Sequence, residues 1–346
     1  MPKVAIVGTT TWGITLGVVL ARRGVGVSLW ARTEQEAIEL RDARYHSHSL
    51  SGISLPPHLS VTSSLSEALA GVRAVILAVP SQRMRQNIKL VARHLDGSML
   101  IVNAAKGLEI DSNKRMSQVI ADEINPDFQS NICVLSGPNL SQEILRDLPA
   151  AAVVAAQDEA VARKAQHLLN TPNLCLYTNT DVMGIELGGA LKNIVALGAG
   201  IADGLEYGDN TKAALITRGL TEITALGVAL GANPLTFSGL TGLGDLIATC
   251  ASPLSRNHYV GVELAKGRPL EEIIKSMNGV AEGVSTTIVA RNLAQQFGLE
   301  MPITEKIYQV LYRGLSPRQA ALELMRAEAK HELAGRRWNL FSLFKR

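Results

Sequence analysis

The chain has little of several things that mark other classes of protein. Three of its 346 residues are cysteine, and their spacing forms neither a CxxC pair nor a zinc motif. A disulfide-stapled fold is therefore excluded, and we expect reduced thiols in a cytoplasmic protein. Aromatic residues make up 4% of the chain, so the core is expected to consist of Ala, Val, Leu and Ile.

An excess of charge of one sign is also absent. The chain has 34 basic and 31 acidic residues, and a net charge of +3 gives no support to nucleic-acid binding or to a membrane-surface role. No uncharged apolar run approaches the ~20 residues that span a bilayer. The most apolar stretch, 182–205, is interrupted by Glu186, Lys192 and Asp203. The N-terminus runs directly into a strand pattern, which predicts no signal peptide.

Glycine and aliphatic residues are abundant, and in the first half they alternate between two patterns. The chain holds 30 glycines, and its length suits two domains of the usual ~150 residues. Apolar runs typical of strands buried on both faces cover residues 4–7, 26–31, 74–79, 100–103, 132–136, 150–155 and 174–178. Helical stretches between them include 33–43, 81–95, 113–124 and 159–169. The alternation predicts an α/β Rossmann-type, doubly wound parallel sheet over residues 1–181.

The strand signal almost disappears after residue 181. Helical patterns cover residues 182–204, 212–230, 270–277, 285–297 and 317–324. They predict a second, all-α domain over residues 182–330, which would carry the substrate site. Residues 331–346 form a basic and aromatic tail ending in RRWNLFSLFKR. We interpret the tail as a partly ordered terminus or a packing strip, with membrane contact as the minor alternative.

A glycine-rich turn follows the first predicted strand and precedes an apolar helix. This is the context in which backbone N–H groups and a helix N-terminus bind a pyrophosphate. Gly8, Thr10 and Gly13 give the pattern G-x-T-x-x-G, with Thr10 at the position of the middle glycine. We expect Thr10 to push the phosphate outward or to shift the loop. An ordinary strand-to-helix turn is the plain alternative, but the surrounding topology favours nucleotide binding.

The second predicted strand ends in Arg32. NAD-binding enzymes usually carry an acid there, which accepts hydrogen bonds from the ribose hydroxyls. A guanidinium cannot accept those bonds, but it pairs well with a 2′-phosphate. Arg32 therefore favours NADP. The neighbouring Glu34 leaves NAD open, and a surface arginine at a strand end is the alternative.

Several short segments occur in a characteristic order along the chain. They are Thr11-Trp12-Gly13, Leu29-Trp30-Ala31-Arg32, Ala78-Val79-Pro80-Ser81, Ala105-Lys106-Gly107-Leu108-Glu109, Ser136-Gly137-Pro138, ELGGALKN from Glu186 to Asn193, GLTGLGD from Gly239 to Asp245, Ser255-Arg256-Asn257 and Val280-Ala281-Glu282-Gly283. Together they are highly specific. From about residue 3 to 324, the chain resembles the bacterial-type NAD(P)-dependent glycerol-3-phosphate dehydrogenases. It departs from that family's pattern at Thr10, at Asn139, where a hydroxyl residue is common, and at Ser141, where a small apolar residue is typical.

The resemblance implies reversible reduction of dihydroxyacetone phosphate to sn-glycerol 3-phosphate with NADP or NAD, for glycerophospholipid synthesis. It implies that Lys192 is the proton donor and acceptor. The substrate-binding residues that it implies are Lys106, Gly137, Asn139, Lys192, Asp245, Ser255, Arg256 and Asn257. The cofactor-binding residues that it implies are Gly8, Thr11, Trp12, Gly13, Arg32, Lys106, Ser141, Arg256, Val280 and Glu282. The assembly is left open, with a homodimer as the candidate.

Elementary chemistry agrees with the role implied for Lys192. Hydride delivery to a carbonyl carbon leaves negative charge on oxygen, which a proton donor or fixed cation has to meet. The residues three and four positions away on its predicted helix are Gly188, Gly189, Val195 and Ala196, so no carboxylate on that helix neutralises the lysine. Burial there should lower its pKa. The alternative is a lysine whose ammonium reaches solvent along the helix surface.

Two further segments suit a small phosphate ester but have plain alternatives. Ser255-Arg256-Asn257 places a hydroxyl, a guanidinium and a carboxamide on adjacent residues. Taken alone, such a triplet is more often a helix cap or a loop. Asp245 ends a glycine-rich loop, where it either accepts hydrogen bonds from substrate hydroxyls or caps a helix over residues 246–250.

Other chemistries have weaker support. His46 and His48 are close together, but no carboxylate pattern completes a metal site around them. Ser136-Gly137-Pro138 lacks the G-x-S-x-G context of a nucleophilic serine. Two rival functions remain: a related β-hydroxyacid dehydrogenase that recognises a carboxylate, and a non-catalytic dinucleotide sensor, suggested by Thr10. Lys106 and Lys192 count against the sensor, because a sensor needs no proton donor.

Overall fold

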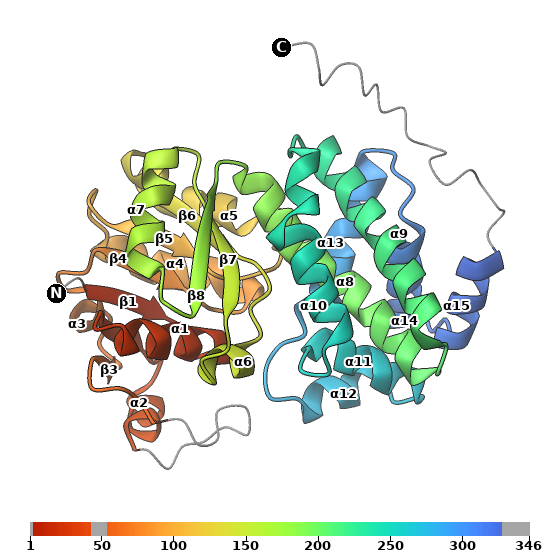
Figure 1. Ribbon diagram of the computed structural model, residues 1–346, viewed down its shortest axis with the longest axis horizontal. Coiled ribbons are helices and arrows are strands. Elements are labelled where there is room, and N and C mark those ends of the chain that lie inside the picture. Colours follow the sequence, from red (N-terminus) through yellow and green to blue (C-terminus); the bar gives the residue numbers. More distant parts are fainter. Residues whose placement is uncertain (1–2, 43–53, 327–346) are drawn as a thin grey trace, which may run out of the picture.

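The computed structural model describes residues 3–42 and 54–326 (Figure 1). The predicted tail over residues 331–346 lies outside these ranges, and so do His46 and His48. The first half forms one sheet of eight strands in the order β3-β2-β1-β4-β5-β6-β7-β8, which confirms the Rossmann-type prediction. Its strands are β1 (Lys3–Val7), β2 (Gly26–Trp30), β3 (Leu59–Thr62), β4 (Ala74–Leu77), β5 (Leu100–Asn103), β6 (Ile132–Ser136), β7 (Ala150–Ala155) and β8 (Leu174–Asn179).

Helices cover both faces of the sheet because alternate strand residues point to opposite faces. Val4 and Ile6 pack with α1 (Thr11–Arg22), α6 (Ser141–Leu145) and α7 (Glu159–Leu169). Ala5 and Val7 pack on the other face, with α3 (Leu65–Leu69), α4 (Met84–Val91) and α5 (Met116–Glu123). A further helix, α2 (Glu34–Arg41), follows β2. Residues that follow the carboxyl ends of β1, β4 and β5, such as Thr10, Ala78 and Ala104, face a cleft.

The sheet departs from the predicted all-parallel arrangement at one place. Strands β6 and β7 pair antiparallel, whereas the other neighbours pair in parallel. A parallel return needs a full crossover, and the connection between β6 and β7 holds just the five-residue helix α6. Strand direction is not encoded in an apolar run, so the sequence pattern did not distinguish the two. The four-residue strand β3 was also missed.

Some helices differ in their bounds from the predicted ones. The stretch 81–95 is divided into a 3₁₀ turn (Ser81–Arg83), α4 and a second 3₁₀ turn (Ala92–His94). The helix predicted from residue 113 begins at Met116, because Asn113 has φ of +55°, in the left-handed region. Helix α11 (Arg256–Ala265) and helix α14 (Pro302–Tyr312) were not predicted from the sequence.

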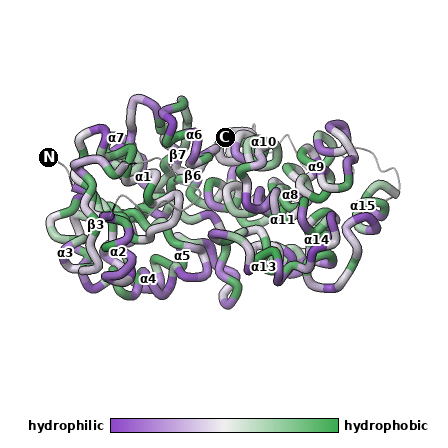
Figure 2. Tube along the Cα trace, turned by 90° about the horizontal axis from the view of Figure 1, so that it is seen from below, coloured by the Kyte–Doolittle hydropathy of each residue, from purple (hydrophilic) through white to green (hydrophobic). Residues whose placement is uncertain are grey.

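The second half is all-helical within the described residues, as predicted, and is built around α8 (Val182–Gly204). Every residue from Gly184 to Ala202 is buried, so α8 is a core helix although it is long and apolar enough to span a membrane. Figure 2 shows hydrophilic stretches along outer helices such as α4. Around α8 are α9 (Gly208–Ala229), α10 (Asp245–Ala251), α11, α12 (Leu270–Ser276), α13 (Glu282–Gln296), α14 and α15 (Pro317–Arg326).

Glycines in α8 let other backbones approach it closely. A Cβ at Gly200 would lie 2.0 Å from the carbonyl oxygen of His258 in α11. A Cβ at Gly188 would lie 2.6 Å from the carbonyl oxygen of Thr241, in the π turn Leu240–Gly244 that precedes α10. These contacts bring the start of α10 and of α11 beside the middle of α8, where Lys192 lies.

We predict that Gly200→Ala lowers the free energy of unfolding by about 1–3 kcal/mol, the usual cost of overpacking a core. The matched control is Gly198→Ala on the same helix, where the nearest atom is the movable methyl of Leu215 at 3.1 Å. There the higher helix propensity of alanine offsets the crowding. Urea unfolding of the two variants checks this, and equal stability would contradict the close approach of α11.

Candidate active site

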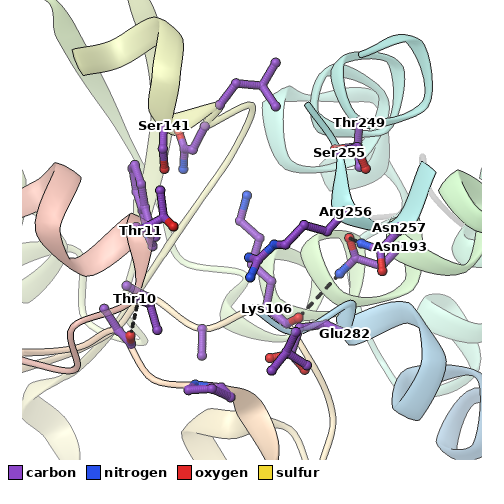
Figure 3. A pocket seen from close by; sticks show the side chains of 18 of the residues that line it. Thr10, Thr11, Lys106, Ser141, Asn193, Thr249, Ser255, Arg256, Asn257 and Glu282 are labelled. Carbon is purple, nitrogen blue, oxygen red and sulfur yellow. Dashed lines mark hydrogen bonds between the residues drawn. The ribbon is translucent and has the colours of Figure 1, made fainter. Parts of the chain in front are cut away.

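A cleft of about 280 Å³ lies between the sheet and the helical domain. Its walls come from the carboxyl ends of the parallel strands and from α8, α10, α11 and α13, and Figure 3 shows Lys106 between the two sides. The predicted site residues that line it are Thr11, Trp12, Lys106, Asn139, Ser141, Lys192, Ser255, Arg256, Asn257, Val280 and Glu282. The predicted residues outside the lining are Gly8, Gly13, Arg32, Gly137 and Asp245.

The glycine-rich turn has the geometry of a close helix–strand approach. Gly8 has φ of +113°, and a Cβ at Gly13 would lie 2.2 Å from the carbonyl oxygen of Gly8. Thr10 is the N-cap of α1: its hydroxyl accepts from the Gly13 N–H at 3.1 Å and donates to the Ala78 carbonyl at 2.7 Å. A glycine could not make these bonds, so Thr10 fixes the start of the helix.

The acid nearest this turn is Glu36, not Glu34. The carboxylate of Glu36 accepts from the Thr9 hydroxyl and, at 2.9 Å, from the Arg32 N–H. Glu34 instead pairs with Arg41 at 2.9 Å and bonds the Ser63 hydroxyl. The Arg32 guanidinium is exposed and makes no ion pair with any residue in the described ranges. An acid and a free guanidinium therefore lie together at the end of β2.

Two lysines share one carboxylate at the base of the cleft. Lys192 donates to Asp245 Oδ1, and Lys106 donates to Asp245 Oδ2 at 2.8 Å. Lys192 also donates to the Thr249 hydroxyl at 2.6 Å, and Lys106 to the Gly137 carbonyl at 2.6 Å. Lys106 follows β5 and Lys192 lies on α8, so this cluster joins the two halves of the chain.

Burial sets the protonation behaviour of Lys192. Its side chain is 7% exposed, and burial lowers its pKa to about 8. The charge of Asp245 raises the pKa and that of Lys106 lowers it, so these two neighbours oppose each other. The lowered pKa predicted from the sequence is confirmed, and the alternative of an ammonium in solvent is wrong.

Asp245 makes different contacts from those expected. Its side chain is 1% exposed, and both oxygens already accept from lysines. The alternative of a cap is also not observed, because Asp245 is the first residue of α10 and Gly244 precedes it as the N-cap. Asp245 is not among the residues that line the cleft, whereas its partners Lys106 and Lys192 are, and its contact with the substrate stays a prediction.

The other end of the cleft is built from the start of α11. Ser255 is the N-cap of that helix and accepts from the His258 N–H at 3.2 Å, which confirms the cap alternative for this residue. Arg256 extends into the cleft, as Figure 3 shows. Arg256 is exposed, and its guanidinium makes no hydrogen bond or ion pair with any residue that the structure describes. An unpaired guanidinium at a helix N-terminus is suited to an anion.

Asn257 and Glu282 hold the cleft together. Asn257 donates to Asn193 Oδ1 at 2.9 Å and accepts from the Gly283 N–H at 2.9 Å. Glu282 accepts from the Ser81 N–H at 2.9 Å and from the Ser81 hydroxyl, which ties α13 to the sheet domain. Burial raises the pKa of Glu282.

Sequence reasoning assigned no role to two residues that line the cleft, Asn193 and Thr249. Asn193 donates to the carbonyl of Lys106 at 3.4 Å, and Thr249 is the second partner of Lys192. Asn193 follows Lys192 directly, which was a usable signal. Thr249 lies one helical turn after Asp245, a spacing that places both on one face of α10.

Polar atoms without partners point to a ligand in this cleft. The Trp12 indole N–H and both amide atoms of Asn139 are buried and make no hydrogen bond within the described part of the chain. Buried polar atoms without partners are rare, and both residues line the cleft. A Rossmann-type sheet, a helical second domain and a lysine pair between them are the features of a dinucleotide-dependent oxidoreductase.

The chain belongs to the NAD-dependent glycerol-3-phosphate dehydrogenase family. The model of the family's N-terminus matches residues 3–162, and the model of its C-terminus matches residues 181–322. This confirms the resemblance found in the sequence.

Individual relatives agree. The chain is 64% identical to a glycerol-3-phosphate dehydrogenase (NAD(P)+) of Dehalococcoides mccartyi, over 100% of this chain and 97% of the relative. It is 47% identical to that of Geobacter sulfurreducens, over 95% and 98%. The crystal structure of the glycerol-3-phosphate dehydrogenase from Coxiella burnetii superposes with a TM-score of 0.88 at 33% identity, over 94% of this chain and 99% of that one.

We predict that Asp245→Asn lowers the pKa of Lys192 further below 8, so that the lysine is largely neutral at neutral pH. The substitution removes the attraction of the carboxylate and leaves the repulsion of Lys106. NMR titration of protein labelled at lysine Cε measures this. The control is Asp127→Asn, which removes an exposed carboxylate elsewhere. A pKa of Lys192 that stays at about 8 in Asp245→Asn would contradict the shared-carboxylate geometry.

Proposed function

We propose that this chain catalyses the reversible reduction of dihydroxyacetone phosphate to sn-glycerol 3-phosphate with NADP(H) or NAD(H). The observation that carries the proposal is the pair of lysines on Asp245, at the base of a cleft whose far end holds the unpaired guanidinium of Arg256. One end suits a carbonyl oxygen that gains negative charge, and the other suits a phosphate. The family membership and the names of the relatives support the same reaction.

The residues at the glycine-rich turn fit a dinucleotide. The open N-terminus of α1, the close approach at Gly13 and the unpartnered Trp12 indole suit a pyrophosphate and its attached groups. Thr11, Ser141, Val280 and Glu282 line the same cleft and would hold the remainder of the dinucleotide. The dinucleotide supplies or accepts a hydride at the substrate carbon.

The chain's own residues handle the proton and the charge. Lys192, with its pKa at about 8, gives its Nζ proton to the substrate oxygen in reduction and takes it back in oxidation. Lys106, facing the same point, stabilises the developing charge as a fixed cation. Asp245 holds both ammonium groups in place.

Arg256 distinguishes this proposal from the β-hydroxyacid alternative. A phosphomonoester carries up to two negative charges, and a guanidinium, the hydroxyl of Ser255 and the N-terminus of α11 together match it. A carboxylate substrate would need fewer donors. The sensor alternative gives no use to the buried lysine pair.

The deciding experiment measures the oxidation of NADPH at a constant protein concentration. Either dihydroxyacetone phosphate or the keto acid that corresponds to a 3-hydroxy acid is added as the substrate. Turnover with the phosphate ester supports the proposal. Turnover with the keto acid alone favours the related dehydrogenase. Binding of NADPH without turnover of either favours the sensor.

Several finer statements belong to the same proposal. The division at residue 181 separates a dinucleotide-binding domain from a substrate domain over 182–330, since β8 ends at Asn179 and α8 begins at Val182. The product would supply glycerophospholipid synthesis in the cytoplasm. The proposed assembly is a homodimer. Size-exclusion chromatography with light scattering would test it.

We expect Arg256→Ala to raise KM for dihydroxyacetone phosphate roughly 10- to 100-fold, the loss of about one charge-assisted hydrogen bond. Lysine should restore affinity partly, because a point charge lacks the planar fork. The matched control is Arg268→Ala, which removes an arginine paired with Glu263 outside the cleft. Steady-state kinetics measure both variants, and an unchanged KM in Arg256→Ala would place the phosphate elsewhere.

We also expect NADPH to give a higher kcat/KM than NADH. Arg32→Ala should narrow that preference by up to ~100-fold, because it removes the partner of a 2′-phosphate. Arg163→Ala, on the surface of α7, serves as the control. A cofactor preference that is the same in Arg32→Ala and in the parent protein would reject the assignment.

A further inference from the structure

Glu186 is a buried carboxylate of α8 that the proposed reaction does not use. It lies at the first turns of the helix and is 6% exposed. It accepts from the Ser117 N–H at 2.7 Å, the Ser117 hydroxyl at 2.5 Å and Arg115 Nη1 at 2.5 Å. Arg115 and Ser117 begin α5, which packs on the sheet. Glu186 therefore fastens the catalytic helix to the sheet domain.

The same carboxylate reaches the segment that carries Lys106. Asn103, the last residue of β5, donates to Glu186 Oε1 at 3.3 Å. The amide of Asn103 also bonds both sides of Ala105: its oxygen accepts from the Ala105 N–H at 3.0 Å, and its nitrogen donates to the Ala105 carbonyl at 3.3 Å. Lys106 is the next residue, so Glu186 and Lys106 are connected through Asn103 and one peptide turn.

Two further residues on the same face of α8 as Glu186 lie against the segment that carries Lys106. Gly189 follows at i+3, where a Cβ would lie 3.6 Å from Lys106 Cγ and 2.5 Å from the Ser136 hydroxyl. Asn193 follows at i+7 and bonds the Lys106 carbonyl at 3.4 Å. Lys192 lies on the neighbouring face, toward Asp245. A shift of α8 on the sheet would thus separate Lys106 from the pair that it completes.

We propose that Glu186 is a positioning residue that locks α8 to the sheet domain and thereby holds Lys106 against the Asp245–Lys192 pair. Asp245 and Lys192 both belong to the helical domain and stay together without Glu186. Lys106 belongs to the sheet domain, and its distance from them depends on how the domains are joined. The expected loss of kcat/KM rests on the proposed function, whereas the expected displacement of Lys106 does not.

A carboxylate, rather than any polar side chain, is needed at this position. Three donors converge on its two oxygens from α5 and a fourth comes from β5. A glutamine has one acceptor oxygen and turns an NH₂ group toward these donors. Glu186→Gln therefore keeps the volume and loses the clamp.

The test compares Glu186→Gln with Glu222→Gln. Glu222 is 7% exposed and accepts from the Ile303 N–H at 2.6 Å and from the Thr304 N–H at 3.1 Å, at the start of α14 and away from the cleft. Both variants remove a buried acidic side chain from a helix of the same domain, and burial raises the pKa of Glu222 to about 7. We measure thermal unfolding, kcat/KM for dihydroxyacetone phosphate against pH, and hydrogen exchange of a peptide containing Lys106.

Both variants should lose stability, but Glu186→Gln alone should lose kcat/KM, roughly 10- to 100-fold, the scale of misplacing a reacting group. The rate of hydrogen exchange in the peptide that contains Lys106 should rise in Glu186→Gln. The fall of kcat/KM at alkaline pH should move above pH 8 in this variant. The charge of Lys106 lowers the pKa of Lys192, so withdrawal of Lys106 raises that pKa. Ser117→Ala should show a smaller effect in the same direction, and it decides the question if Glu186→Gln does not fold.

Stability loss in Glu186→Gln with kcat/KM, pH profile and exchange equal to those of Glu222→Gln would overturn the proposal. If the parent protein does not reduce dihydroxyacetone phosphate, the proposed function is wrong. In that case the exchange measurement, which needs no turnover, still decides the role of Glu186: faster exchange in Glu186→Gln than in Glu222→Gln supports it, and equal exchange refutes it.

Discussion

The arrangement of the cleft depends on one ionic interaction, the carboxylate of Asp245 shared by two lysines from different halves of the chain. Burial alone would disfavour either ammonium, and two of them facing one point would repel each other. With the carboxylate behind them, both positive charges remain directed at the cleft. The geometry gives one lysine a pKa of about 8, suited to moving protons near neutral pH, and leaves the other to meet negative charge.

Close packing of α8 makes this interaction possible. Glycines at 188 and 200 admit the π turn before α10 and the backbone of α11, so that Asp245 and Arg256 approach the middle of the helix. The polar residues of α8 at positions 186 and 193 then bind the sheet domain, while Lys192 faces α10. A single helix thus sets the distance between the proton donor, the fixed cation and the anion-binding arginine.

Much of this could be predicted from the sequence, since buried strands, the glycine-rich turn and an uncompensated lysine on an apolar helix leave clear local patterns. The antiparallel β7 could not, because direction depends on the path of the connection rather than on the strand's residues. The lysine partners of Asp245 could not be predicted, because Lys106 and Lys192 are distant from it in sequence. The link through Glu186 is long-range for the same reason, and the motif around it shows no charge partner nearby.

The central claim is that the ammonium of Lys192 supplies the proton, and the pH dependence of kcat/KM for carbonyl reduction tests it most directly. The charged lysine is the active form in that direction, so kcat/KM should fall as pH rises through about 8. Lys192→Met, similar in length but uncharged, should lose ~10²–10⁴-fold in activity and show no such limb, while still binding NADPH. Near-normal turnover of Lys192→Met on both sides of pH 8 would contradict the account and make Lys106 the proton donor.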